Sequence, residues 1–158
     1  MTSNGIISYH PCIGNVCEVG ATGQKITLTN YENATDPTYA DLLIFLKADK
    51  TDEQAYTNAY TCADFAETLH NNAEKAGIKC AWVGCHFTQG IGHAFNEFNT
   101  TDQGIVYIDC TGIPAPNGNQ DKVLTCVVGQ PLTSEYLFRS NYYSVGNMGI
   151  VKKLDVFW

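Results

Sequence analysis

Positive charge is scarce in this chain of 158 residues, which has nine lysines and arginines against sixteen aspartates and glutamates and a formal net charge of −7. The nine cations are spread along the chain and form no basic cluster. Nucleic-acid binding depends on clustered cations that neutralise several phosphates, so we expect no nucleic-acid partner. The acidity favours solubility and carries no information about a substrate.

Long apolar runs are also missing, and none approaches the roughly 20 residues that a membrane span requires. The longest apolar cluster runs from Leu42 to Leu46 and predicts a buried helix face. There is no internal repeat and no low-complexity tract. Hydrophobic residues make up 44% of the chain, enough for a core. We therefore expect a single domain over residues 1–158.

The first five residues, Met1 to Gly5, lack the charged and apolar regions of a secretory signal. A cytoplasmic protein and a trimmed exported or cell-surface domain both fit this start, so the compartment stays open.

Cysteine is abundant, and its number, seven, is odd. In an intracellular protein all seven would be free thiols, whereas in an exported one up to three bridges would leave one reactive thiol. Cys12 with Cys17 is the only pair that local spacing suggests.

Two helices are expected. Asp36 as N-cap and Pro37 as first helical residue predict a helix that ends near Lys47. Thr61 and Asp64 fit a capping box at the start of a second helix, for which Gly77 is the natural end.

The other elements are expected to be β-strands, and helices followed by an antiparallel meander indicate the α+β class. Residues 1–35 are expected to form an N-terminal extension with two short strands. The ranges that predict strands are 5–9, 25–30, 78–87, 92–98, 105–110, 122–128 and 148–158; 135–144 is ambiguous, and 111–121 is expected to be a loop.

Cys62 is the candidate nucleophile. It falls at the first residue of the second predicted helix, where unpaired backbone N–H groups and the helix dipole favour a thiolate. The same N–H groups can stabilise an oxyanion during acyl transfer. None of the other six cysteines has this placement, although a small buried hydrophobic role is the common one for such a residue.

His93 and Asp109 are the candidate base and the acid that orients it. If the strands are joined by a five-residue connection at 99–103, Phe98 faces Gly104 and His93 lies opposite Asp109. Opposed side chains share a face, with Cβ atoms about 5 Å apart. A one-residue slip would separate them.

The other histidines fit the role less well. His86 is the main rival, at the end of the preceding strand. His70 lies two turns along the helix of Cys62, and His10 lies in the N-terminal region. Glu97 shares the predicted face of His93 and is interpreted as a solvated or supporting acid.

Three short motifs together resemble the core of the transglutaminase-like superfamily. They are Tyr60 to Ala66, Gly92 to Asn96 and Tyr107 to Asp109. The resemblance covers roughly residues 36–128. It implies a small papain/transglutaminase-like core, in which a helix bearing the Cys packs on an antiparallel sheet bearing the His and Asp. The catalytic triad that it implies is Cys62, His93 and Asp109.

The second oxyanion donor upstream of the Cys in such enzymes has three candidates here, namely Gln54, Tyr56 and Tyr60. Four aromatic residues are candidates to line a groove, although core packing is their default role. They are Trp82, Tyr107, Tyr142 and Tyr143.

The expected function is acyl transfer or hydrolysis at an amide of a protein or peptide substrate, through a thioester and without a cofactor. The alternative is a binding or structural domain that keeps the fold without turnover. A third hypothesis is a metal site at Cys80, Cys85 and His86. Strand alternation puts the two cysteines on opposite faces, and no tight pair is present, which disfavours this hypothesis.

Overall fold

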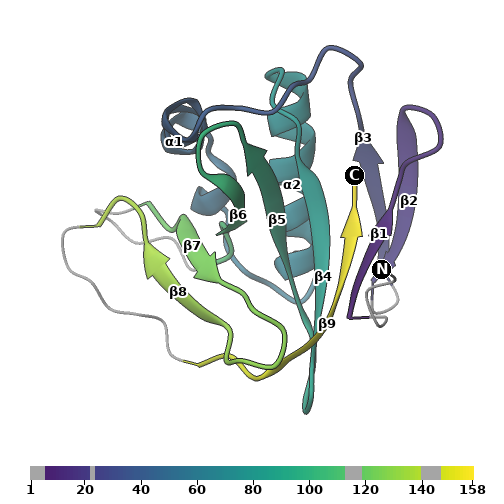
Figure 1. Cartoon of the computed structure of the whole chain (residues 1–158), viewed down its shortest axis with the longest axis vertical. Helices are drawn as coiled ribbons and strands as arrows, with labels where there is room; N and C mark the ends of the chain where they lie inside the picture. The colour runs from purple at the N-terminus through teal and green to yellow at the C-terminus, as the bar shows by residue number, and fades with distance from the viewer. Residues whose placement is uncertain (1–5, 22–23, 113–118, 140–146) are drawn as a thin grey trace.

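Seven strands form one mixed sheet in the computed structural model, which describes residues 6–21, 24–112, 119–139 and 147–158 (Figure 1). Their order is β1-β9-β4-β5-β6-β7-β8, and every neighbouring pair is antiparallel except β1 and β9. The strands are β1 (Ile7–His10), β4 (Ala81–Phe87), β5 (His93–Thr100), β6 (Gly104–Asp109), β7 (Lys122–Thr125), β8 (Thr133–Tyr136) and β9 (Val151–Phe157). The antiparallel run from β4 to β7 matches the predicted meander, and β8 is a further strand at the start of the range that was left ambiguous. The α+β class is confirmed.

The helix of Cys62, α2 (Cys62–Lys75), begins and ends where the sequence predicts. Thr61 is its N-cap, and both hydrogen bonds of the capping box with Asp64 are present. Gly77 follows the C-cap with a φ of 87°, a left-handed conformation that glycine adopts without strain.

The first helix, α1 (Tyr39–Ala48), begins later than predicted. Its N-cap is Thr38, whose side chain accepts a hydrogen bond from the backbone N–H of Asp41. The prediction of Asp36 as N-cap was therefore wrong, because a second capping residue lies two positions further on. The apolar cluster at 42–46 is only partly buried: Leu42 and Leu46 are inside, but Ile44 is 69% exposed.

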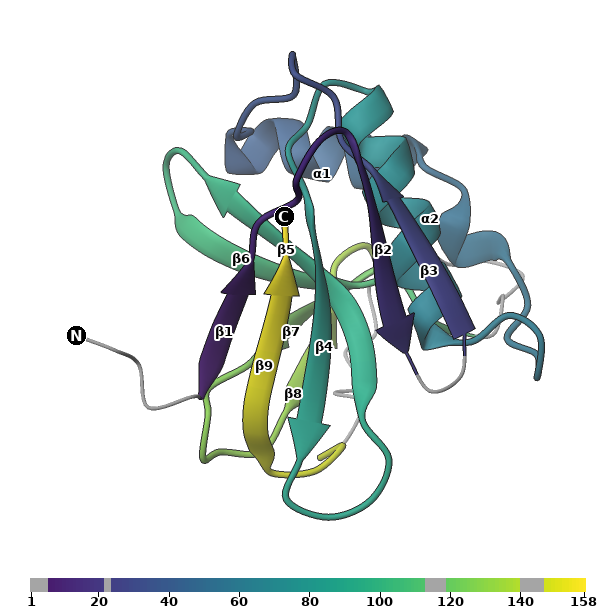
Figure 2. The same cartoon turned by 90° about the vertical axis from the view of Figure 1, so that its right-hand side faces the viewer.

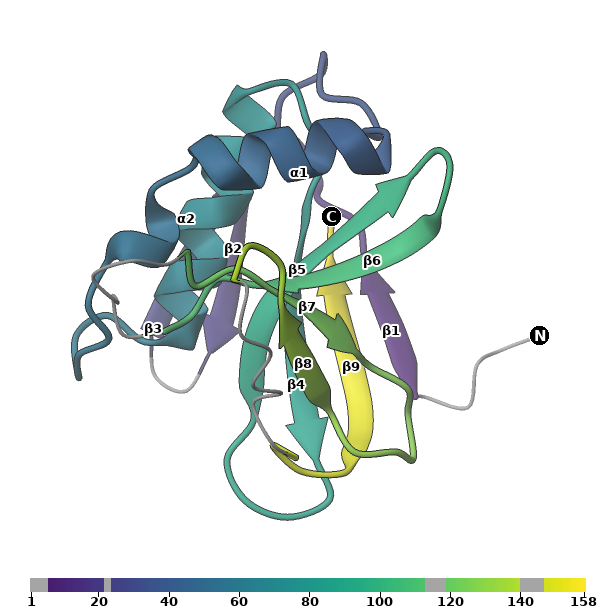
Figure 3. The same ribbon diagram turned by 90° about the vertical axis from the view of Figure 1, so that its left-hand side faces the viewer.

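The sheet has an apolar core on each face. Both helices cover one face, where Phe65 and Leu69 of α2 pack on Phe98 of β5. On the other face the sheet curls, so that β7 and β8 lie over β4 and β9 (Figure 3). A backbone bridge between Pro131 and Ile150 links the two ends of this curl.

Sheet side chains bind the main chain of the first two turns of α2. Trp82 Nε1 donates to the carbonyl of Ala63 at 3.1 Å, and Asn96 Nδ2 donates to the carbonyl of Ala66 at 2.8 Å. Trp82 and Asn96 are direct partners across β4 and β5. These buried hydrogen bonds fix the start of α2 over the centre of the sheet. Loss of either side-chain donor would remove a buried hydrogen bond and lower the stability of the fold.

The N-terminal region is more ordered than the predicted extension. In addition to β1, which joins the main sheet, it forms a hairpin of β2 (Val16–Ala21), which was not predicted, and β3 (Gln24–Thr29). The hairpin lies alongside α2 (Figure 2), and its apolar side chains share a core cluster with Ala63 and Ala66 of α2 and with Trp82 of β4. Cys12, which precedes β2, and Cys17, the second residue of β2, are disulfide-bonded, as local spacing suggested.

Polar side chains of α2 occupy the free edge of β3 and the residues after it. Glu67, Asn71 and Glu74 accept hydrogen bonds from three backbone N–H groups at 2.8 to 3.0 Å. These donors belong to Thr27, Thr29 and Tyr31. Acceptors at this spacing lie along one side of a helix. The side chains of α2 therefore accept hydrogen bonds from backbone N–H groups of the hairpin, as the carbonyls of a neighbouring strand would.

The hairpin between β5 and β6 has a different register from the predicted one. Thr100 pairs with Gly104, and Asn96 pairs with Ile108, so the connection is shorter and the pairing is shifted by two residues. His93 and Asp109 are therefore diagonal and not directly opposed. A shift of two keeps both side chains on the same face, because side-chain direction alternates with period two.

Neither helix in the described part of the chain has the length and apolar character needed to cross a membrane.

The attachment of the hairpin to α2 can be tested with Asn71→Ala. Asn71 also donates to the carbonyl of Thr27, so the change leaves two backbone groups without a partner. We expect the free energy of unfolding to fall by about 1–3 kcal/mol in urea titrations. Lys75→Ala, at an exposed site on the same helix, is the control and should change it by less than about 0.5 kcal/mol. Equal stability of the two variants would contradict this role of Asn71.

Candidate active site

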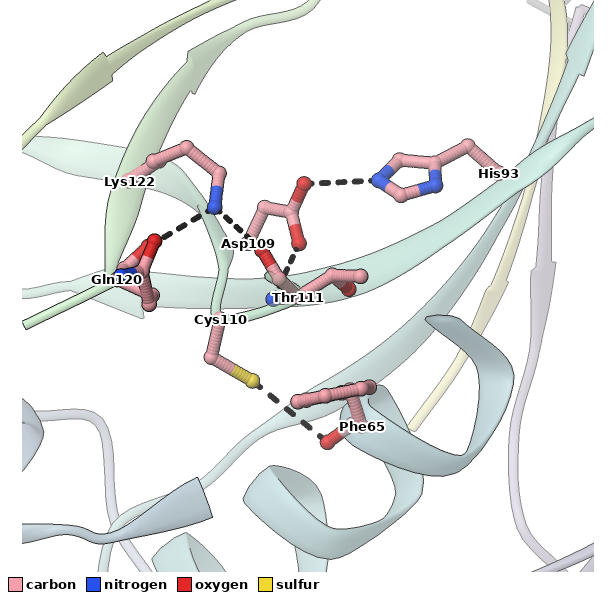
Figure 4. A network of polar contacts seen from close by, with 7 residues as sticks. All are labelled: Phe65, His93, Asp109, Cys110, Thr111, Gln120 and Lys122. Carbon is pink, nitrogen blue, oxygen red and sulfur yellow. Dashed lines mark hydrogen bonds and ion pairs between the residues drawn. The ribbon is translucent and has the colours of Figure 1, made fainter. Parts of the chain in front are cut away.

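The three predicted site residues meet at one end of the sheet. Cys62 is the first residue of α2, His93 the first of β5, and Asp109 the last of β6. Because β5 and β6 are antiparallel, the start of one lies beside the end of the other. His93 Nε2 lies 2.8 Å from Asp109 Oδ2 (Figure 4).

The thiol of Cys62 hydrogen-bonds to the imidazole of His93. Since Nε2 faces Asp109, Nδ1 is the ring nitrogen left for the thiol. Burial tends to raise the pKa of Cys62, but the hydrogen bond and charge of His93, followed by the backbone N–H of Ala94, bring this pKa below its ordinary value. The cysteine is thus set up to ionise with the histidine protonated.

The positive charge on His93 is stabilised in turn by Asp109. Burial tends to lower the pKa of His93, and the charge and hydrogen bond of Asp109, with a further contribution from Cys62, raise it well above its ordinary value. The side chain of His93 is 15% exposed, and that of Asp109 only 3%. In so little solvent the ion pair is weakly screened.

Asp109 is itself fixed by groups behind it. Its Oδ1 accepts a hydrogen bond from the backbone N–H of Thr111 at 2.8 Å, and its Oδ2 faces His93. Burial tends to raise the pKa of Asp109, but His93, then Lys122 and Thr111, lower it. Asp109 therefore remains ionised and holds the imidazole in one orientation.

Lys122, which the sequence analysis did not single out, is buried beside this carboxylate. Its Nζ donates to the carbonyls of Thr111 and Gln120 at 2.5 and 2.8 Å (Figure 4). Its place as the first residue of a strand gave no sign of this role. Asp109 and Lys122 are register partners across β6 and β7, and this pairing places the positive charge of Lys122 beside the carboxylate of Asp109.

Of the three candidate oxyanion donors, only Tyr56 reaches the nucleophile. Its hydroxyl hydrogen-bonds to both the thiol and the backbone of Cys62, and burial, followed by the charge of Cys62, raises the pKa of Tyr56. Tyr60 instead bonds to Thr68 at 2.8 Å. Gln54 is exposed, caps the short 3-10 helix η1 (Thr51–Glu53) and does not line the cleft.

Cys62 and His93 line a cleft of about 510 Å³. One wall comes from the N-terminal hairpin through Gly20 and Gln24, and the side chain of Gln24 is anchored to Asp64 at 3.1 Å. Other residues lining the cleft include Tyr56, Asn58, Trp82, Gly84, His86, Ile91, Asp155 and Phe157.

Of the four predicted aromatic residues, Trp82 lines the cleft, although it is only 3% exposed. Tyr107 packs in the core on the curled face of the sheet. Tyr142 and Tyr143 lie outside the described residues.

The competing histidines have other partners. His86 and His10 approach the two carboxylate oxygens of Asp155 at 2.9 and 3.0 Å, on the cleft side of the sheet. His70 is buried in α2, and burial lowers its pKa to about 4. The structure thus joins His93, and not His86, to Cys62.

Of the two roles predicted for Glu97, a solvated or a supporting acid, the first is wrong. It is 0% exposed, and burial raises its pKa to about 7. It lies on the curled face of the sheet opposite Tyr107, which the sequence pattern could not distinguish from an exposed position.

The proposed metal ligands do not gather. Cys80 packs under the helices, Cys85 packs in the core of the opposite face, and His86 pairs with Asp155. In the described ranges no three His, Cys, Asp or Glu residues are grouped so as to hold a metal ion.

Comparison with known proteins gives no relative. The chain matches no protein-family model, and searches of curated proteins and of solved structures give no significant match.

The dependence of His93 on Asp109 can be tested with Asp109→Asn. Loss of the carboxylate charge should lower the pKa of His93 by about 1–3 units, as read from a ring-proton NMR titration. Asp155→Asn removes another carboxylate of the same cleft that does not contact His93, and should leave this titration unchanged. A pKa of His93 that is the same in Asp109→Asn and in the wild type would refute the ion pair.

Proposed function

We propose that this chain catalyses thiol-dependent acyl transfer or hydrolysis at an amide or peptide bond, on a papain/transglutaminase-like core. The observation that carries the proposal is the contact of Cys62 with His93 and of His93 with Asp109, at the floor of an open cleft. Nucleophile, base and orienting acid in this chain of contacts are what covalent catalysis by cysteine requires.

In the first half-reaction the Cys62 thiolate attacks the substrate carbonyl carbon. The oxyanion that forms is stabilised by backbone N–H groups at the start of α2, and the hydroxyl of Tyr56 is the second donor. His93 then gives its proton to the departing amine, and the acyl group remains on Cys62 as a thioester.

In the second half-reaction His93 removes a proton from the incoming nucleophile, and the thiolate leaves. Water yields hydrolysis and an amine yields transfer. We favour hydrolysis for so small a domain. The cleft is open, and two of the apolar side chains that line it are accessible: Tyr56 is 46% exposed and Ile91 is 86% exposed. Such accessible apolar side chains suit an extended segment of a protein or peptide.

An activated ester tests acylation without knowledge of the natural substrate. With p-nitrophenyl acetate we expect one acetyl group per chain on Cys62, located by peptide mass spectrometry and released by hydroxylamine. His93→Gln should slow the acetylation of Cys62 by about 100-fold or more, because the thiolate then lacks its proton acceptor.

His86→Gln is the matched control, since it removes the other histidine of the cleft and should leave the acetylation rate within about twofold. Acetylation of Cys62 that is no faster than that of Cys126, or that is equally fast in His93→Gln, would leave the binding-domain alternative as the better description.

A further inference from the structure

Two cysteines outside the proposed triad contact each other. Cys85 lies on β4 and Cys126 directly follows β7, and their thiols hydrogen-bond to one another across the core of the curled face. β4 and β7 are separated by two strands in the sheet order, so this contact exists only because the sheet curls.

The two other buried free thiols have partners of a different kind. Cys80 donates to the carbonyl of Ala81 at 3.6 Å, and Cys110 donates to the carbonyl of Phe65 at 3.7 Å. Both are fully covered by the core on the helix face. They are therefore kept away from a dissolved oxidant.

The thiols of Cys85 and Cys126 differ in their access to solvent. Cys85 is 2% exposed, whereas Cys126 is partly exposed. The hydrogen bond from Cys85 also lowers the pKa of Cys126, and Cys126 correspondingly raises the pKa of Cys85. Because it is the more exposed of the two, Cys126 is the thiol that meets a dissolved reagent first.

We propose that Cys85 and Cys126 are a redox-active dithiol that closes into a disulfide across the curled face of the sheet, leaving Cys62 free. The co-reactant is a small-molecule disulfide. The Cys126 thiolate attacks one of its sulfurs and releases one thiolate. Cys85 then attacks the sulfur of Cys126, and its proton goes to the second departing thiolate. Two cysteine thiols are oxidised, and one small disulfide is reduced to two thiols.

The bond lies directly next to the proposed catalytic histidine. Cys85 is the register partner of His93, at the last pair of the ladder between β4 and β5. The carbonyl of Cys85 also packs so closely on Gly92 that a Cβ there would lie 2.6 Å from it. A covalent link at Cys85 therefore fastens the strand end that presents His93, and adds stability by constraining the unfolded chain. It does not require that Cys62 be catalytic.

The test is oxidation of the reduced chain with oxidised glutathione, followed by blocking with N-ethylmaleimide and mapping of unreduced peptides. We expect a Cys85–Cys126 crosslink, a rise in Tm of several degrees that dithiothreitol reverses, and free Cys62 that still reacts with iodoacetamide. The known Cys12–Cys17 bond, which should re-form, serves as the internal standard.

Single variants separate the two roles. Cys85→Ser should accumulate one glutathione on Cys126, because the second thiol is gone. In Cys126→Ser, Cys85 should stay unmodified, because it is buried. Circular dichroism checks that both variants fold. If either does not, the peptide map of the oxidised wild-type chain decides whether the Cys85–Cys126 crosslink forms. Recovery of both cysteines as maleimide adducts once Cys12–Cys17 has formed, or a crosslink that includes Cys62, would overturn the proposal.

Discussion

The site depends on how the first two turns of α2 are held against the sheet. Trp82 and Asn96, partners on adjacent central strands, donate to main-chain carbonyls of that segment. Cys62 is the first residue of α2, and His93 begins the strand that carries Asn96. The position of the thiol relative to the imidazole is therefore set by buried hydrogen bonds between rigid elements and not by loops. A displacement of this helix start would remove the environment that lowers the pKa of Cys62.

Local signals account for the parts of the site that the sequence predicted. The capping box at Thr61 placed Cys62 at a helix N-terminus, because caps are encoded within four residues. His93 and Asp109 were placed on one face although the assumed register was wrong, because the error was two residues and parity was kept. The turn length, which decides the register, depends on how Thr100 and its neighbours bond, and alternation alone does not reveal this.

Features that depend on distant pairing were not predictable. The strand before β3 and the cleft wall at Gln24 arise because side chains of α2 bind the β3 edge, a contact of more than 35 residues in sequence. Likewise, Glu97 lies under a curl of the sheet that no local pattern indicates. The charge of Lys122 comes close to the carboxylate of Asp109 only because β6 and β7 pair. Burial of charge in a curled sheet is a property of topology, which local sequence patterns do not encode.

The central claim is that Cys62 and His93 form a thiolate–imidazolium pair. The most direct measurement is the rate of iodoacetamide labelling from pH 4 to 9, mapped to individual cysteines, for the wild type and His93→Ala. The account predicts that Cys62 labels fastest, that its apparent pKa lies well below the roughly 8.5 of a free cysteine, and that His93→Ala abolishes this advantage. A Cys62 that labels like an ordinary thiol, or not at all, would contradict it.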